Sequence, residues 1–149
     1  MNKCNICPHN CNVDRKKQKG RCRATDKVKI ALASLHFYEE PCISGQNGSG
    51  TVFFSHCNLS CVYCQNYKIS QQDFGKEVSI KQLAKIFLSQ QQKGANNINL
   101  VTPTMYVEHI IAAIIIALQC LNACRNNSPI DISLSLLSFI PMLLIFVFF

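Results

Sequence analysis

The sequence lacks an apolar leader at its amino terminus. It begins Met1-Asn-Lys-Cys-Asn-Ile-Cys7, which contains no signal segment. Yet the chain has 10 cysteines among 149 residues, and in a secreted protein such a composition would suggest disulfides. Without a signal for export, we expect a cytoplasmic protein whose clustered cysteines bind metal in a reducing environment.

The chain also lacks the length of a complete barrel. A (β/α)8 barrel takes about 250 residues, and even a six-stranded partial barrel is hard to fit into 149 residues. This length corresponds to one domain with at most a small appendage.

Acidic residues are scarce, and aromatic residues are missing from the amino-terminal part. The chain has 8 Asp and Glu against 15 Lys and Arg, and nine of these basic residues precede residue 30. Such an imbalance favours anionic partners, nucleic acid among them. However, no aromatic residue that could stack on a base precedes Phe37. We therefore interpret the basic runs 15–19 and 21–23 as a solvated face, with a zinc-knuckle nucleic-acid-binding protein as the second function class.

Three cysteines follow a short apolar run in the middle of the chain. Cys57, Cys61 and Cys64 have the spacing C-x3-C-x2-C and come directly after Thr51-Val-Phe-Phe54, which is typical of a buried strand. In parallel α/β sheets, ligands bind where strands end. Three thiolates suit a cubane iron–sulfur cluster in which each sulfur binds one iron. The fourth iron is then free for a substrate or cofactor.

A packing role for these cysteines is the competing interpretation. Their spacing also places them on one face of a helix, where cysteine packs as a small apolar residue. Asn58, Ser60, Gln65 and Asn66 disfavour a helix interior, so we favour metal ligands. The neighbouring His56 is a candidate ligand or proton carrier, but we expect it to shape the loop by hydrogen bonding.

A second set of cysteines lies near the amino terminus. Cys4, Cys7, Cys11 and Cys22 have the spacing C-x2-C-x3-C-x10-C, with turn residues between them. So short a segment cannot bury a core, and a metal would order it. Four thiolates suit tetrahedral zinc or a second iron–sulfur cluster, and the sequence does not separate the two.

The rest of the chain predicts alternating strands and helices. We expect a strand within residues 27–38, a turn at 45–50, a helix over 79–93, a strand at 98–101 and a helix over 106–123. The first of these helices begins with the capping box of Ser79 and Gln82 and ends at Gly94. The second is apolar nearly all round, as if it were covered on more than one side. Strand, cysteine loop, helix and strand form one right-handed βαβ unit.

The segment Cys57-Asn-Leu-Ser-Cys61-Val-Tyr-Cys64 resembles the cluster loop of radical S-adenosylmethionine enzymes, including the aromatic Tyr63 before the third cysteine. The resemblance is closest to proteins similar to pyruvate formate-lyase activating enzyme. It covers about residues 1–118 and includes the following motifs: Ile43-Ser-Gly45, Gly48-Ser-Gly50, Cys64-Gln-Asn66, Ile69-Ser70, Phe74-Gly-Lys-Glu77 and Asn97-Ile-Asn-Leu-Val-Thr-Pro-Thr104.

This resemblance implies an oxidoreductase of the α/β class, built as the amino-terminal part of a (β/α) partial TIM-like barrel after the cysteine knuckle. Cys57, Cys61 and Cys64 would bind a [4Fe–4S] cluster whose open iron chelates S-adenosylmethionine. Reductive cleavage would give a 5′-deoxyadenosyl radical that abstracts hydrogen from a substrate, which in activating enzymes is a partner protein. A one-electron donor such as flavodoxin or ferredoxin is implied as well.

The resemblance also implies a set of cofactor-binding residues, namely Tyr63, Asn66, Thr102 and Thr104. In the family, a Gly-Gly-Glu-like turn after the second strand binds the amino group of S-adenosylmethionine. This chain instead has Thr102-Pro-Thr104, which offers hydroxyl groups and no carboxylate.

We divide the chain into a knuckle (1–26), a partial radical S-adenosylmethionine domain (27–125) and a tail (126–149) outside the resemblance. Residues 132–149 carry no charge and have the marginal length of a membrane span. Arg125 is the only positively charged residue near them, so no positive-charge signal sets an orientation. A membrane-tethered fragment is thus a third hypothesis, and we expect the tail to reflect a frameshift, an early stop or a gene fragment. An incomplete barrel predicts weak or absent turnover.

Overall fold

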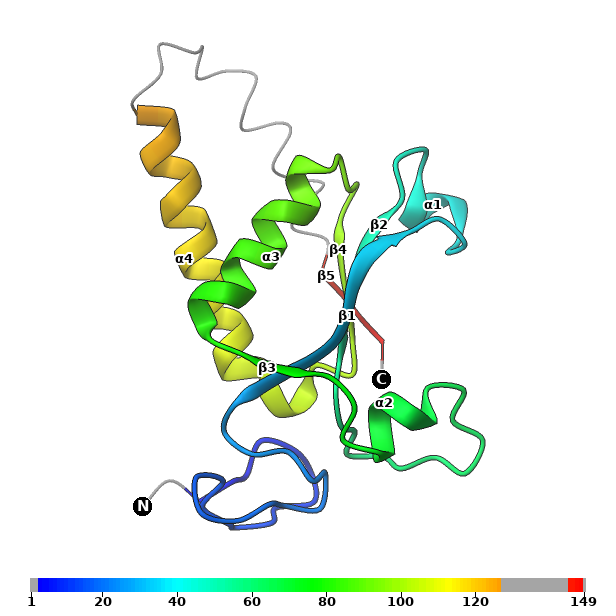
Figure 1. Ribbon diagram of the computed structural model, residues 1–149, viewed down its shortest axis with the longest axis vertical. Coiled ribbons are helices and arrows are strands. Elements are labelled where there is room, and N and C mark those ends of the chain that lie inside the picture. Colours follow the sequence, from blue (N-terminus) through cyan, green and yellow to red (C-terminus); the bar gives the residue numbers. More distant parts are fainter. Residues whose placement is uncertain (1–2, 127–144, 149) are drawn as a thin grey trace.

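The computed structural model describes residues 3–126 and 145–148 (Figure 1). The elements in chain order are β1 (Val28–His36), α1 (Pro41–Ser44), β2 (Ser49–Phe54), α2 (Tyr67–Gln71), β3 (Lys76–Val78), α3 (Ile80–Gln92), β4 (Ile98–Val101), a 3₁₀ turn (Thr104–Tyr106), α4 (Val107–Asn126) and β5 (Ile145–Phe148). The strands and long helices that the sequence predicts are confirmed, whereas the short α1, α2, β3 and β5 were not predicted.

The strands form one mixed sheet in the order β3-β1-β2-β4-β5. β1 is antiparallel to both β2 and β3, while β2 and β4 run parallel and pair Val52 with Leu100. The carboxyl ends of β2 and β4 therefore lie at the same edge of the sheet. α3 and α4 both lie on one side of it (Figure 1).

The tail lies mostly outside the described residues. The expectations for residues 132–149, a membrane span or a sequence foreign to the family, therefore stay predictions. The structure describes residues 145–148, which form β5 and pair in parallel with β4.

Local sequence explains where α3 begins and ends. The Ser79 backbone N–H donates to Gln82 Oε1 at 2.8 Å, and the Gln82 N–H donates to Ser79 Oγ at 3.3 Å, so the predicted capping box is confirmed. Gly94 follows with φ of +84° and ends the helix. The apolar stripe buries Leu83, Ala84 and Phe87 in the core against the sheet.

α4 differs from its prediction because only one of its faces is covered by the described residues. Ile110, Ala113 and Ala117 are buried in the core next to α3. The opposite face exposes apolar residues, namely Val107, Ile111, Ile115 and Leu118. By length and composition, residues Thr104–Ala123 could cross a membrane, with 28% of that window buried. The core helix of a soluble protein can have the same length and composition.

Leu83→Ala should lower the free energy of unfolding by about 2–5 kcal/mol, because Leu83 is fully buried under the sheet and its loss leaves a cavity. Denaturant titration followed by circular dichroism measures this loss. Lys85→Ala is the matched control on the exposed face of the same helix. Equal effects of the two substitutions would contradict the packing of α3 described here.

Candidate metal centre

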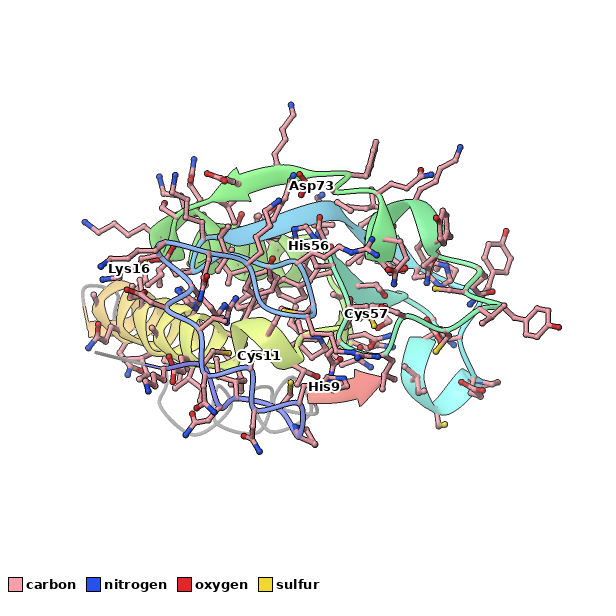
Figure 2. All side chains as sticks on the ribbon, turned by 90° about the horizontal axis from the view of Figure 1, so that it is seen from below. His9, Cys11, Lys16, His56, Cys57 and Asp73 are labelled. Carbon is pink, nitrogen blue, oxygen red and sulfur yellow. The ribbon has the colours of Figure 1, made fainter. Side chains whose placement is uncertain are left out.

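The cysteine loop leaves the carboxyl end of β2. Cys57 is buried, Cys64 is half-buried and Cys61 is exposed, and all three are free thiols. The loop thus runs from the interior to the surface. The amino-terminal segment lies at the same end of the sheet (Figure 1), and Figure 2 shows His9, Cys11 and Cys57 at this end of the molecule.

Two of the sulfur atoms already have hydrogen-bonding partners. The backbone N–H of Leu59 donates to Cys57 Sγ at 3.4 Å, and the hydroxyl of the buried Ser70 lies 3.3 Å from Cys64 Sγ. Hydrogen bonds to cysteine sulfur stabilise the thiolate form and tune the potential of an iron–sulfur cluster. The loop therefore carries candidate sulfur ligands, and hydrogen-bond donors beside two of them would tune the potential of a bound cluster.

Left-handed backbone conformations shape the loop. His56 has φ of +73° and Ser60 has φ of +55°, a region that residues other than glycine seldom adopt. The His56 N–H donates to the carbonyl of Ile69 at 3.0 Å, which ties the start of the loop to α2. Such strain persists only where surrounding contacts hold it, and it is often found at functional sites.

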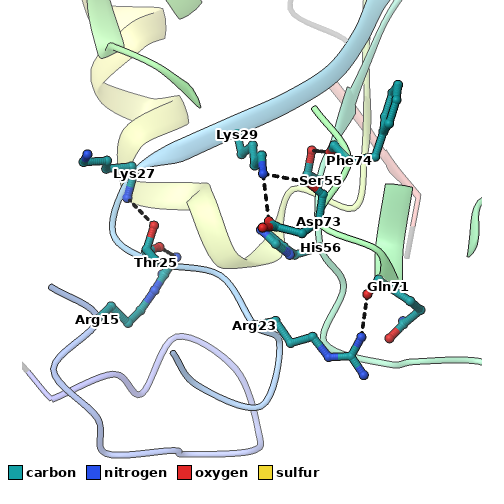
Figure 3. Close-up of polar contacts among 10 residues, drawn as sticks. All are labelled: Arg15, Arg23, Thr25, Lys27, Lys29, Ser55, His56, Gln71, Asp73 and Phe74. Carbon is teal, nitrogen blue, oxygen red and sulfur yellow. Dashed lines mark hydrogen bonds and ion pairs between the residues drawn. The ribbon is translucent and has the colours of Figure 1, made fainter. Parts of the chain in front are cut away.

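The His56 side chain is held by a chain of polar contacts (Figure 3). His56 Nε2 lies 3.1 Å from Asp73 Oδ1, and Lys29 Nζ donates to the same oxygen at 2.8 Å. Burial lowers the pKa of His56, although the carboxylate of Asp73 opposes this shift. The hydrogen bond from Lys29 lowers the pKa of Asp73. The expectation that His56 shapes the loop through hydrogen bonding agrees with this arrangement.

A glycine allows the segment before β3 to approach the end of β2. Gly75 has φ of +121°, and a Cβ atom there would lie 2.4 Å from Ser55 Oγ and 2.6 Å from the carbonyl oxygen of Ile30. The Ser55 hydroxyl donates to the carbonyl of Phe74. Glycine is therefore required at this position, which explains one residue of the motif Phe74-Gly-Lys-Glu77.

Basic residues of the amino-terminal segment bind carbonyl groups around the site. Arg15 is 8% exposed and donates to the carbonyls of Met105, at 2.5 Å, and Thr25. Arg23 donates to the carbonyl of Gln71 at 2.6 Å (Figure 3). The interpretation of the basic runs as a solvated face is thus wrong for Arg15. Its partner lies 90 residues away, so the sequence carried no signal for its burial.

The residues predicted to bind S-adenosylmethionine are spread over the site. Tyr63 is 97% exposed, and Asn66 is half-buried at the start of α2. The hydroxyl of Thr102 donates to the carbonyl of Phe54 at 3.1 Å, which links the ends of β4 and β2. Thr104 lines a cavity with the amino-terminal cysteines. Their cofactor role stays a prediction.

Within residues 3–126 and 145–148, no three side chains of His, Cys, Asp or Glu are gathered at metal-binding distance. The thiols of the loop are nevertheless of the right kind and number for three iron atoms. They also lie on one short irregular segment. Because metal binding is coupled to local folding, the bound group would complete the convergence of these ligands.

Comparison with known proteins supports an iron–sulfur protein. Residues 43–110 match a family described as a 4Fe-4S single cluster domain. The chain is also 33% identical over 117 residues to an uncharacterized protein of Methanocaldococcus jannaschii; the match covers 72% of this chain and 33% of that protein. The chain thus spans about a third of the length of this relative. No solved structure matches the chain significantly.

The region that matches the single-cluster family contains the cysteine loop. Residues 43–110 contain three cysteines, namely Cys57, Cys61 and Cys64. That these three cysteines ligate the cluster stays a prediction; if they are its only cysteine ligands, one of the four irons lacks a cysteine.

Replacing Cys57, Cys61 or Cys64 with alanine should remove most of the cluster iron and the associated charge-transfer absorption. The reason is that a cubane held by two thiolates loses its anchoring. Iron and sulfide analysis after anaerobic reconstitution measures this effect. Cys42→Ala is the matched control, since Cys42 is an exposed thiol outside the matched region. Unchanged iron content in all three variants would refute the assignment.

Arg15→Ala should lower the free energy of unfolding by about 1–3 kcal/mol, because it leaves the carbonyls of Met105 and Thr25 without these donors. Denaturant titration compares it with Lys16→Ala, whose side chain is exposed. If both variants have the stability of the unaltered protein, Arg15 does not brace the site.

Proposed function

We propose that the chain is a radical S-adenosylmethionine protein. It binds a [4Fe–4S] cluster through Cys57, Cys61 and Cys64 and binds S-adenosylmethionine at the remaining iron. The observation that carries the proposal is the match of residues 43–110 to a single-cluster domain in a region with three cysteines. An iron without a cysteine ligand is the position that a chelating cofactor requires.

The protein supplies ligation and positioning, while the bound groups supply the chemistry. When bound, the cluster provides the electron that cleaves S-adenosylmethionine to methionine and a 5′-deoxyadenosyl radical, which abstracts hydrogen from a substrate. The buried Cys57 anchors the loop from inside. His56, Asp73 and Lys29 fix the start of the loop. The N–H of Leu59 and the hydroxyl of Ser70 stabilise negative charge on sulfur.

The fold supports a barrel of which these strands form a part. β2, β4 and β5 are parallel neighbours. The chain passes from β2 to β4 through α2, β3 and α3, and α3 lies on the same side of the sheet as α4. This is the pattern of consecutive βα units, in which ligands bind at the carboxyl ends of the strands. We propose that the three strands belong to a partial TIM-like barrel and that β1 and β3 extend it by antiparallel pairing.

The exposure of Cys61 suits the approach of a one-electron donor such as flavodoxin or ferredoxin. A substrate protein that loses hydrogen from a backbone glycine is the partner by analogy with activating enzymes, and the cytoplasm provides the reducing surroundings. The described strands form an open sheet, which leaves a radical poorly shielded from water. We therefore expect turnover to be slow.

The hypothesis of nucleic-acid binding is weakened, because some of the basic side chains are not free to contact phosphates. Arg15, Arg23 and Lys29 bind groups of the protein itself. Lys16, Lys17, Lys19 and Arg21 are exposed, and salt-sensitive RNA binding by iron-free protein would favour this second function.

The anaerobically reconstituted and reduced protein should release 5′-deoxyadenosine from S-adenosylmethionine slowly, and Cys61→Ala should abolish this release while Cys42→Ala preserves it. The reason is that Cys61 holds one corner of the cluster. Chromatography of the quenched reaction measures the product. Full iron loading without any 5′-deoxyadenosine would contradict the proposed reaction, and fast cysteine-dependent turnover would contradict the expected slowness.

A further inference from the structure

The four amino-terminal cysteines face a common space. Cys4, Cys7, Cys11 and Cys22 line one small cavity together with Arg15, and its far wall contains Asn58 of the cysteine loop. All four are free thiols. They lie outside residues 43–110, which match the single-cluster family. The four cysteines around this cavity are therefore not part of the matched cluster domain.

Backbone turns fold the segment that carries the first three of these cysteines; among the described residues no three ligand side chains lie at metal-binding distance, so a bound ion would draw the sulfur atoms closer together. The Cys4 N–H donates to the carbonyl of Val13 at 2.9 Å, and the Asn12 N–H donates back to the carbonyl of Cys4 at 2.9 Å. The Asn10 N–H closes a tight turn on the carbonyl of Cys7 at 3.0 Å. Asn10 and Asn12 take the left-handed conformation, with φ of +41° and +54°, which asparagine tolerates. This is a folded knuckle rather than an irregular tail.

Polar and charged groups of the chain lie around the sulfur atoms. The Arg21 N–H donates to Cys11 Sγ at 3.4 Å. The buried Arg15 lines the same cavity as the four cysteines. Four thiolates around a divalent cation carry a net charge of −2. The basic residues concentrated before residue 30 offset that charge.

The small size of the cavity favours a single metal ion over a cluster. Its volume is about 10 Å³, close to the smallest cavity that holds one water molecule. A cubane of four iron and four sulfide atoms would need a much larger space, whereas a single ion would not. An all-sulfur tetrahedral site of this kind is typical of structural zinc.

We propose that Cys4, Cys7, Cys11 and Cys22 bind one zinc ion, which orders the segment that braces the cysteine loop. Binding forms four zinc–sulfur bonds, releases the thiol protons to solvent and changes no oxidation state. The ordered segment then positions His9, whose Nε2 lies 2.8 Å from the carbonyl oxygen of Asn58, and Arg15, which donates to the carbonyl of Met105. The knuckle thereby contacts the cysteine loop at Asn58 and the turn after β4 at Met105.

Metal analysis of the full chain tests this proposal, with Cys22→Ala and Cys7→Ala compared with Cys42→Ala. We expect about one zinc ion per chain in the unaltered protein and in Cys42→Ala, as for a closed four-cysteine site. The two knuckle variants should lose most of the zinc. Replacement of zinc by cobalt should give the absorption spectrum of tetrahedral sulfur coordination.

Three outcomes would overturn the proposal: zinc content unchanged in the knuckle variants, loss of additional iron and sulfide instead of zinc, or a cobalt spectrum that is not tetrahedral. If the knuckle variants fail to fold, a zinc chelator can be added to the unaltered protein. Chelation should then increase hydrogen exchange in residues 3–26 and around Asn58, and unchanged exchange there counts against the proposed role. Iron lost through Cys57→Ala is measured separately, so failure of the zinc site and failure of the cluster are distinguishable.

Discussion

The parallel pairing of β2 with β4 is the constraint on which the rest of the structure depends. It places the carboxyl ends of both strands at one edge of the sheet, so that the cysteine loop leaves β2 beside the turn that follows β4. The hydroxyl of Thr102 fastens the two ends together through the carbonyl of Phe54. The core beneath, with Phe54 and Tyr106 in tilted ring contact at 5.7 Å, keeps this edge rigid. Sulfur ligands carried on a short loop need such a support to converge on one cluster.

The loop is held mainly by contacts from outside itself. Lys29 on β1 reaches Asp73, which in turn contacts His56, and the amino-terminal knuckle adds contacts to Asn58 and Met105. These contacts act on backbone groups and on a buried imidazole, so they position the loop without supplying thiolates. A zinc ion in the knuckle would have a mechanical role in this arrangement, while the redox chemistry would be confined to the three cysteines of the loop.

Sequence reasoning succeeded where the determinants are local. The capping box of Ser79 and Gln82 lies within one turn and is confirmed. The C-x3-C-x2-C spacing lies within one loop, and its role as a ligand set stays a prediction. It failed where the partners are distant and carry no pattern of their own. The burial of Arg15 depends on a carbonyl 90 residues away, and the contact of Lys29 with Asp73 spans 44 residues. Hydrophobicity on every side of α4 could not reveal which face would be covered.

Mössbauer spectroscopy of the iron-57 cluster, before and after addition of S-adenosylmethionine, tests the central claim most directly. If Cys57, Cys61 and Cys64 bind three irons of a [4Fe–4S] cluster, one iron of the four should be distinct and should change its parameters when S-adenosylmethionine is added, while the other three remain nearly constant. Four equivalent irons that do not respond to S-adenosylmethionine would contradict an open corner. So would a spectrum that contains no four-iron cluster.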